Sequence, residues 1–219
     1  MPEDWLASYP AVREHEPLAR HSWYGIGGRA RYFLELDDAA LLPELIARLN
    51  ADAVPYLVIG AATNTLFAAA EQPGLTIQLL PPENFPPPSG GRVREGALSV
   101  NGDSVSVPAG YLMPKLAAEM AKAGRAGLEF AAGVPGAVGG SVFGNAGAFG
   151  SEVKDWLVST EAIDEQGELR TVTAAECAFA YRDSIFKRER QRWVITFASV
   201  PSSTQNRLFP VVSVFQNVP

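Results

Sequence analysis

The sequence is poor in the residues that make disulfides and metal sites. It has one cysteine, Cys177, and two histidines, His15 and His21. A single cysteine forms no internal disulfide, so nothing requires an oxidising compartment. We expect Cys177 to be a small buried apolar side chain. No cysteine and histidine cluster has metal-ligand spacing, which argues against a zinc site.

The sequence also lacks a signal peptide, a membrane span and an excess of basic residues. Its first residues show no basic segment followed by an apolar run, and its apolar stretches are far shorter than the ~20 residues of a spanning helix. A formal net charge of -6 is a poor match to nucleic acid. These absences predict a cytoplasmic protein without membrane or nucleic-acid partners, and we take it to be a monomer.

The composition and patterning indicate a globular α/β chain. Of the 219 residues, 47% are hydrophobic and 19% charged, which is enough to form a core. A helix after Asp37 or Asp38 would bury Leu42, Leu45, Ile46 and Leu49, with Pro43 in its first turn. Strands are expected at 31–36, 54–60 (a buried strand) and 75–80. The first ~80 residues are therefore a β-α-β-loop-β unit, an α/β half-domain.

Local signals organise the second half. Asn101-Gly102 predicts a hairpin, and residues 113–123 predict a helix ended by Gly124. Further expected features are an inward helix face at Leu116, Ala117, Met120 and Ala121, strands 159–164 and 168–172 joined at Gln166-Gly167, a capping box at Thr173 and Glu176 that starts a short helix, and a strand from Trp193.

Proline and glycine mark the domain boundaries. We expect a loosely held leader at 1–20, a first subdomain at 21–80, a Pro-rich connection at 81–91, a second subdomain at 92–198 and an atypical tail at 199–219. The connection is either a linker or a long surface loop. The tail, with Arg207 as its single charged residue, is either mobile or the product of a truncated or frameshifted sequence.

The first segment that could bind a ligand is PYLVIGAATNTLF at 55–67. A strand leads into Gly60, Ala61 and Ala62, whose small side chains allow a ligand to approach the backbone. Successive N–H groups in such a turn can hold a phosphate, and Thr63 and Asn64 add polar side chains. The alternative is an ordinary turn after a strand.

The second segment, GLEFAAGVPGAVGGSVFGNAGAFG at 127–150, is very rich in glycine. It matches neither the G-x-G-x-x-G of a Rossmann turn nor a Walker loop. Its candidate ligand-binding residues are Gly133, Gly136, Gly139, Gly140, Ser141, Asn145, Ala146 and Gly147. Backbone packed against a flat or charged ligand would explain them. The alternative is a glycine-rich loop threading a tight core.

The third segment is FAYRDSIFK at 179–187, in which Arg182 follows Tyr181. A guanidinium in a pocket offers a planar fork of donors to a carboxylate or a developing enolate. The alternative is a structural ion pair with Asp183.

Four motifs together resemble the UDP-N-acetylenolpyruvoylglucosamine reductase (MurB) family. SWYGIGGRARYFLE (22–35) is similar to the family's N-T-F-x-I-G-G-x-A, and VIGAATNTL (58–66) to its L-G-x-G-S-N-x-L. Residues 127–150 match G-L-E-F-L-A-G-I-P-G-x-V-G-G-A-V-x-M-N-A-G-A-Y-G nearly letter for letter, and 179–187 match F-x-Y-R-x-S-x-F-K. The resemblance covers about residues 20–198.

The resemblance implies an α+β fold, the FAD-binding fold of vanillyl-alcohol oxidase (PCMH type), made of two α/β subdomains. It implies bound FAD and NADPH as co-substrate, for reduction of UDP-N-acetylglucosamine enolpyruvate to UDP-N-acetylmuramate in peptidoglycan precursor synthesis. Residues 60–64 would hold the diphosphate and the segment from Gly133 to Gly147 would line the flavin. Tyr181 would shape the pocket, and Arg182 would be catalytic.

Departures from the family pattern qualify these expectations. Ala62 replaces a family glycine and is expected to be tolerated only with a negative φ, whereas Thr63 keeps the hydroxyl of the usual serine. The family's proton-donating serine and assisting glutamate have no counterpart here, so we expect FAD binding with slow or no turnover. The alternatives are a non-catalytic FAD-binding module, an FAD oxidase of the same fold, and a purely structural domain.

Overall fold

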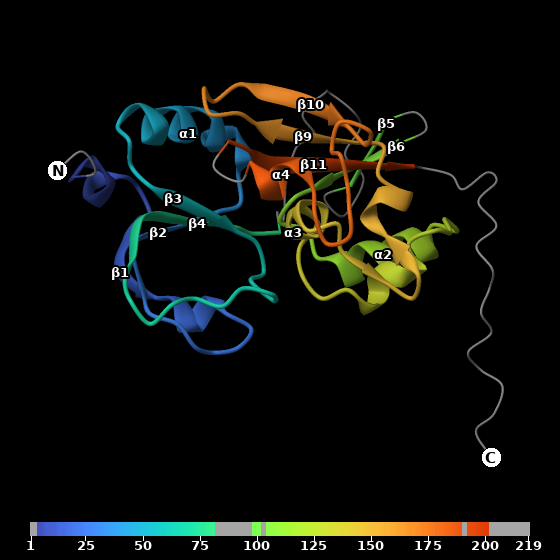
Figure 1. Cartoon of the computed structure of the whole chain (residues 1–219), viewed down its shortest axis with the longest axis horizontal. Coiled ribbons are helices and arrows are strands. Elements are labelled where there is room, and N and C mark those ends of the chain that lie inside the picture. Colours follow the sequence, from blue (N-terminus) through green and yellow to red (C-terminus); the bar gives the residue numbers. More distant parts are fainter. Residues whose placement is uncertain (1–3, 82–97, 102–103, 190–191, 202–219) are drawn as a thin grey trace, which may run out of the picture.

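The computed structural model describes residues 4–81, 98–101, 104–189 and 192–201. These residues form a four-stranded sheet of order β1-β2-β4-β3, a five-stranded sheet of order β10-β9-β11-β6-β5, and a two-stranded ribbon of β7 and β8. Figure 1 shows the two larger sheets side by side, with helix α1 above the first sheet and beside the second, and helices α2 and α3 below the second sheet. The mixture of helices and strands confirms the α+β fold class.

The first sheet is mixed. β2 (Arg29–Leu36) and β3 (Tyr56–Ile59) both run parallel to the central β4 (Gln72–Leu79), and β1 (Arg13–Pro17) pairs antiparallel with β2. The predicted strands at 31–36, 54–60 and 75–80 are therefore confirmed. The expectation that 54–60 is a buried strand is wrong, because β3 lies at the sheet edge and only Ile59 in it is fully buried.

Helix α1 (Leu42–Ala51) covers one face of this sheet. All four residues of its predicted stripe are buried, at Leu42, Leu45, Ile46 and Leu49. Pro43 lies in the first turn, where its missing N–H costs nothing. The Asp38 carboxylate accepts from the N–H of Ala40 and begins the short helix η3 (Ala39–Leu41) just before α1.

The predicted leader is part of the fold. Residues 4–21 form helix η1 (Asp4–Ser8), strand β1 and helix η2 (Leu18–His21), and Leu6 and Leu18 are buried. Strand β1 could not be predicted from the sequence, because REHEP has no apolar alternation and the strand is held by backbone pairing to β2.

The second sheet is antiparallel throughout. Its strands are β5 (Ser99–Asn101), β6 (Ser104–Pro108), β9 (Ser159–Ile163), β10 (Leu169–Thr173) and β11 (Val194–Pro201). The two predicted hairpins, β5–β6 and β9–β10, are confirmed. β11 continues past the predicted boundary at 198, and residues 102–103, most of the Pro-rich connection and the tail beyond Pro201 lie outside the described residues.

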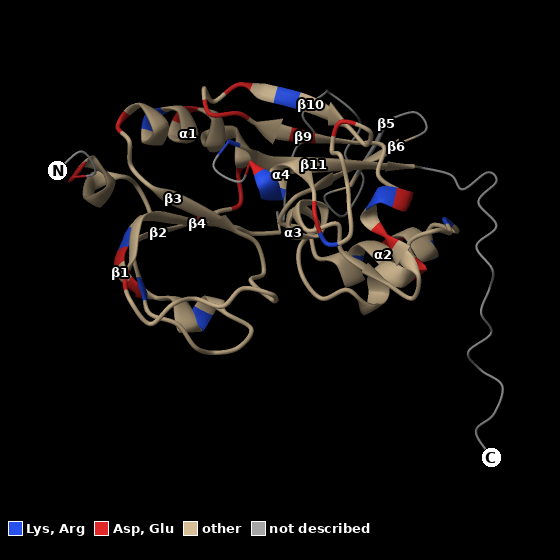
Figure 2. Ribbon diagram, in the orientation of Figure 1, with Lys and Arg blue, Asp and Glu red and all other residues tan. Residues whose placement is uncertain are grey.

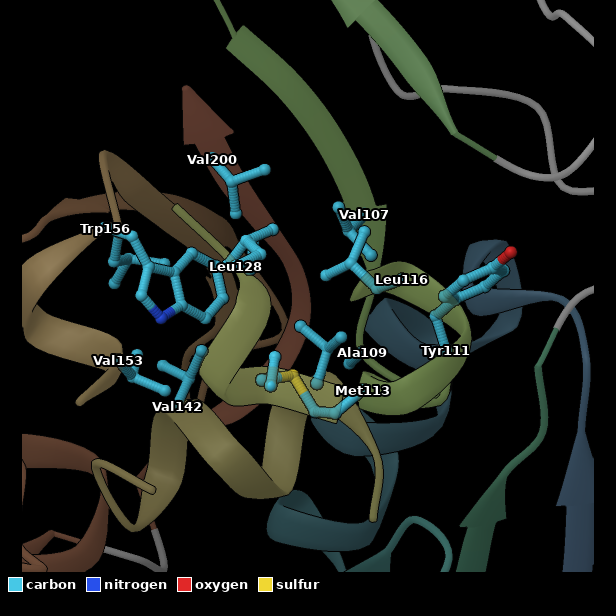
Figure 3. Packing of buried hydrophobic residues seen from close by; sticks show 14 of the residues in the cluster. Val107, Ala109, Tyr111, Met113, Leu116, Leu128, Val142, Val153, Trp156 and Val200 are labelled. Atoms are coloured by element: carbon cyan, nitrogen blue, oxygen red, sulfur yellow. The ribbon is translucent and has the colours of Figure 1, made fainter. Parts of the chain in front are cut away.

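Helix α2 (Met113–Lys122) ends as predicted before Gly124, which adopts a φ of +69°. Leu116, Ala117 and Met120 are buried, but Ala121 is exposed and Met113 takes the fourth inward position. The core between α2, α3 and β11 includes Leu128, Val142, Trp156 and Val200 (Figure 3). The remaining short elements are η4 (Glu129–Gly133), α3 (Val138–Phe143), β7 (Gly147–Ala148), β8 (Ser151–Glu152), η5 (Val153–Asp155) and α4 (Ile185–Arg188).

The capping box forms without the helix it was expected to start. The Glu176 carboxylate accepts from the backbone N–H of Thr173 at 2.8 Å, and the Thr173 hydroxyl accepts from the N–H of Glu176 at 3.3 Å, but residues 174–178 form only a turn. Cys177 is buried there, and burial raises the pKa of its thiol to about 12. Its expected role as a small apolar side chain is confirmed.

Helix α1 also joins the two sheets. Ile163 and Val194 of the second sheet belong to the same apolar core as α1. A Cβ on Gly167 would lie 2.4 Å from the carbonyl oxygen of Pro43, and Asn50 Nδ2 donates to the carbonyl of Glu165 at 2.8 Å. Among the described residues, no helix has the length and apolar character needed to cross a bilayer.

The buried stripe of α1 provides a direct test of this arrangement. We expect Ile46→Ala to lower the free energy of unfolding by about 2–5 kcal/mol, because it leaves a cavity in the core. The matched control Glu44→Ala changes an exposed residue of the same helix and should stay within about 0.5 kcal/mol of the parent. Urea unfolding followed by circular dichroism measures both, and equal losses would contradict the packing.

Candidate functional site

The two small-residue segments predicted to bind a ligand contact each other. Residues 60–64 form the turn that follows β3, and it lies against residues 135–137 at the start of α3. The Thr63 hydroxyl donates to the carbonyl of Pro135 at 3.1 Å. A Cβ on Gly60 would lie 2.7 Å from Cβ of Ala137, closer than real Cβ atoms approach. The small residues at this contact therefore serve close backbone packing between the two sheets.

The glycine-rich segment is partly helical, which differs from the loop that was its alternative interpretation. Gly139, Gly140 and Ser141 lie in α3. Gly139 packs on Ala109, to whose carbonyl its N–H donates at 2.8 Å, and the Ser141 hydroxyl donates to the carbonyl of Ala137 at 3.0 Å. A Cβ on Gly140 would meet nothing within 4 Å. One side of α3 is thus packed and the side at Gly140 is open.

Asn145 links the glycine-rich segment to the third motif. Its side chain is fully buried, and Nδ2 donates to Glu152 Oε2 at 3.0 Å and to the carbonyl of Ala180 at 2.8 Å. Its Oδ1 accepts from the N–H of Lys154 at 3.1 Å. The amide therefore holds the chain around α3 next to the segment that carries Tyr181 and Arg182.

Arg182 is exposed, in contrast to the pocket expected for it. Its Nη2 donates to the carbonyl of Gly147 at 2.8 Å, and its guanidinium lies 5.7 Å from the ring centroid of Tyr181, which is itself 81% exposed. The alternative ion pair with Asp183 does not form, because Asp183 pairs with Arg188. Arg182 is thus held beside the glycine-rich segment with its head group open to solvent.

A charged pair that no motif indicated lies next to this group. The Lys154 ammonium is 2.6 Å from Glu152 Oε2. The pKa of the Glu152 carboxyl lies below its usual value chiefly because Lys154 donates to it, with Asn145 and the charge of Arg182 acting in the same direction. Glu152 is therefore an anion at neutral pH. A lone glutamate after a loop gives no sequence signal that separates it from a solvated surface residue.

Left-handed backbone recurs around the site. Ala62 has a φ of +46°, Asn145 +44°, Phe149 +52° and Arg182 +52°. The expectation that Ala62 requires a negative φ is wrong, since alanine adopts the left-handed conformation here at a cost of roughly 1–2 kcal/mol. Residues held in this conformation concentrate at ligand-binding sites, where the surroundings enforce it.

The predicted residues fall in two groups at the ends of α3. The first, where α3 begins, contains Gly60, Ala61, Ala62, Thr63, Asn64 and Gly136. The second, where α3 ends, contains Asn145, Ala146, Gly147, Tyr181 and Arg182, while Gly133 packs on Phe149. A helix of six residues is about 9 Å long, so the two groups suit an elongated ligand.

The sequence model of the FAD binding domain family matches residues 30–173. This chain belongs to the FAD binding domain family. Its predicted relationship to the UDP-N-acetylenolpyruvoylglucosamine reductases (MurB) is confirmed by relatives bearing that name. The protein of Carboxydothermus hydrogenoformans is 38% identical over 84% of this chain and 57% of its own length, and that of Halalkalibacterium halodurans is 37% identical over 81% and 55%.

The solved structures contain the same fold. A crystal structure of a UDP-N-acetylenolpyruvylglucosamine reductase (MurB) from Thermus caldophilus is 27% identical and has a TM-score of 0.62, covering 85% of this chain and 59% of that one. The PCMH-type FAD-binding fold is thereby confirmed for this FAD-binding-domain chain. The chain spans less than two thirds of the length of each of these reductases.

The contact at Gly60 predicts unequal effects of two glycine substitutions. Gly60→Ala should lower the free energy of unfolding by about 1–3 kcal/mol, because its methyl group forces the turn away from Ala137. The control Gly140→Ala has open space and lies in a helix, so it should raise stability by up to ~1 kcal/mol. Thermal unfolding distinguishes them, and equal effects would refute the contact.

The strain at Ala62 predicts a stabilising glycine. We expect Ala62→Gly to raise the free energy of unfolding by about 1 kcal/mol, because glycine adopts a positive φ without strain. The neighbouring control Ala61→Gly, where φ is not positive, should lower it by about 0.5–1 kcal/mol. Chemical denaturation measures both, and the idea fails if the two glycines act in the same direction.

Proposed function

We propose that this chain binds FAD along α3 and that it is the FAD-binding portion of a UDP-N-acetylenolpyruvoylglucosamine reductase. That enzyme would use NADPH to reduce UDP-N-acetylglucosamine enolpyruvate to UDP-N-acetylmuramate for peptidoglycan synthesis. The observation that carries the proposal is the contact of the turn at 60–64 with residues 135–137, since it joins the two motifs that resemble the family's flavin site. The enzyme is proposed to be monomeric and cytoplasmic, and the lone cysteine agrees with a reducing compartment.

The turn has the character that a diphosphate requires. Ala61 and Ala62 have small side chains, so a ligand could approach the backbone closely. The positive φ of Ala62 is the kind of conformation that turns successive N–H groups toward one concave side, where an anion binds. Thr63 and the exposed Asn64 add polar side chains at the same place. These residues would hold the diphosphate of FAD.

The residues beyond the turn suit the flavin end of the ligand. Gly140 leaves one side of α3 free of side chain, which allows a flat ring to approach. Gly147 and Tyr181 lie at the far end of α3, next to Arg182. When bound there, FAD would supply hydride transfer to the substrate.

Arg182 is the residue proposed to stabilise charge in the reaction. Its guanidinium has five N–H donors, and the Gly147 carbonyl accepts from one nitrogen, Nη2. The remaining donors can bind a substrate carboxylate and stabilise the negative charge that develops beside it. The bond to Gly147 fixes the position of the head group before the substrate arrives. We assign the proton donor to no residue of this chain.

The exposure of Arg182 favours a second candidate, a non-catalytic FAD-binding module. A catalytic guanidinium acts most strongly when water is excluded from it, and here the side chain is exposed. The two candidates share the flavin site and differ in turnover.

Both candidates predict that the purified chain takes up FAD and shows flavin absorption bands. Thr63→Val should weaken FAD binding about tenfold, because it removes the hydroxyl that donates to Pro135 and frees the turn. Thr171→Val, an exposed threonine of β10, is the matched control and should bind as the parent does. Equilibrium dialysis with detection by visible absorbance measures the dissociation constant of FAD for the parent and both variants. A protein that stays colourless at saturating FAD would refute the proposal.

A further inference from the structure

His21 is largely enclosed by polar groups of the first sheet. Its side chain is 10% exposed, and its ring lies on Phe33 with 4.1 Å between the centroids. Nε2 is 3.0 Å from Glu16 Oε1, and Nδ1 is 2.8 Å from Gln78 Oε1. Both ring nitrogens therefore have a hydrogen-bond partner.

Gln78 connects His21 to the turn proposed to hold the diphosphate. Its Nε2 donates to the carbonyl oxygen of Gly60 at 3.1 Å. Because a carbonyl only accepts, the amide nitrogen of Gln78 must face Gly60 and the amide oxygen must face His21. The orientation of this amide is thus fixed by its partners.

The partners of His21 call for a proton on both ring nitrogens. The amide oxygen of Gln78 and the ionised carboxylate of Glu16 are both acceptors, so each ring nitrogen must donate. A neutral imidazole carries one N–H and satisfies one contact, whereas the imidazolium carries two and satisfies both.

The charges around His21 agree with this assignment. Glu35 Oε1 on β2 lies 3.8 Å from Nδ1, so carboxylates approach the ring from two strands. Arg13 lies 3.0 Å from Glu35 and 3.9 Å from Glu16, and Arg20 lies 3.8 Å from Glu16. Figure 2 shows basic and acidic segments next to each other along β1. Burial alone would raise the pKa of Glu16, but the bond from His21 and the nearby arginines hold it below its usual value.

We propose that His21, in its imidazolium form, is a positioning residue for the FAD diphosphate that acts through Gln78 on the peptide between Gly60 and Ala61. A trans peptide is planar and directs its carbonyl and N–H to opposite sides. Holding the carbonyl of Gly60 therefore fixes the direction of the Ala61 N–H, one of the groups proposed to face the diphosphate. The inference rests on the proposed FAD binding.

The proposal requires FAD affinity to depend on pH. A ring with a proton on both nitrogens completes the chain of hydrogen bonds from Glu16 to Gly60, whereas a ring with one proton keeps one of its two contacts and holds the turn less firmly. Low pH favours the doubly protonated form of an imidazole, so the affinity for FAD should be higher at about pH 6 than at about pH 8.5.

The first experiment measures the dissociation constant of FAD from about pH 6 to about pH 8.5, the range that brackets histidine titration. The parent's constant should rise about threefold to tenfold, the effect of losing one hydrogen bond. His21→Gln should bind weakly at every pH. The control His15→Asn changes an exposed histidine that pairs with Glu71, at a φ of +53° that asparagine tolerates, and should keep the rise. A rise that persists in His21→Gln, or a flat parent profile, would overturn the proposal.

Glu16→Gln separates positioning by charge from a merely structural role. An amide at position 16 can donate to Nε2, so a neutral imidazole satisfies both contacts and still donates to Gln78. This variant should bind FAD as the parent does at low pH and lose the pH dependence. If the pH dependence persists in this variant, the protonation of the ring is not what positions the turn, and the proposal fails.

Measurements without FAD distinguish failure of this inference from failure of the proposed function. Amides of residues 60–64 should exchange hydrogen about threefold to tenfold faster in His21→Gln than in the parent at low pH, and the two should converge at high pH. The chain has two histidines, so ¹⁵N NMR with His15→Asn identifies His21 and shows whether both nitrogens are protonated. Equal exchange, or a singly protonated ring at low pH, would overturn the inference even if FAD binds. If the amides of residues 60–64 exchange as expected but the protein binds no FAD, the proposed flavin site is refuted and the link from His21 to the turn stands.

Discussion

Gly60 of the turn after β3 and Gly136 of the segment leading into α3 each pack on a side chain of the other segment more closely than a Cβ permits, and the candidate site depends on this contact. A Cβ at Gly60 or at Gly136 would lie under 3 Å from Ala137 or Thr63 respectively. The two segments belong to different sheets and are joined by no continuous element, so glycine at these positions is what allows one surface to be built from both. The hydrogen bond from Thr63 to Pro135 then fixes their register. A ligand lying along α3 would therefore touch both subdomains.

A second attachment between the sheets lies at α1 and keeps this contact from acting as a hinge. Asn50 donates to Glu165, and Gly167 approaches the carbonyl of Pro43. Two sheets joined at one point can rotate relative to each other. Two sheets joined at two separated points have little freedom to rotate. Apolar residues of both sheets share the core around α1, so rotation would also expose buried surface. The arrangement of the two segments at α3 is preformed for that reason, which reduces the ordering that a ligand would have to impose.

The sequence predicted well what is local and periodic. The stripe of α1 and the hairpin at Gln166-Gly167 follow from spacing and turn chemistry alone. It failed where backbone pairing or distant partners decide, as in β1, which has no apolar alternation, and at Thr173, whose capping bonds close a turn and no helix. In the candidate site, the motifs picked out two segments that the fold brings into contact, and their binding of a ligand stays a prediction. The left-handed Ala62 and the partial burial of His21 depend on contacts made across the sheet. No pattern within one segment encodes those contacts.

Ala62 and its neighbours show how the turn is kept in a conformation that alanine disfavours. The left-handed backbone costs roughly 1–2 kcal/mol, and a hydrogen bond within a protein contributes about 1 kcal/mol. One such bond precedes Ala62, from Gln78 to Gly60, and one follows it, from Thr63 to Pro135. Together they are of the same size as the strain, so the turn is stable with both and close to balance with one. A turn so close to balance responds to a change at His21. Weakening the network of His21 and Gln78 weakens the bond from Gln78 to Gly60, and this is one of the only two side-chain hydrogen bonds described at the turn.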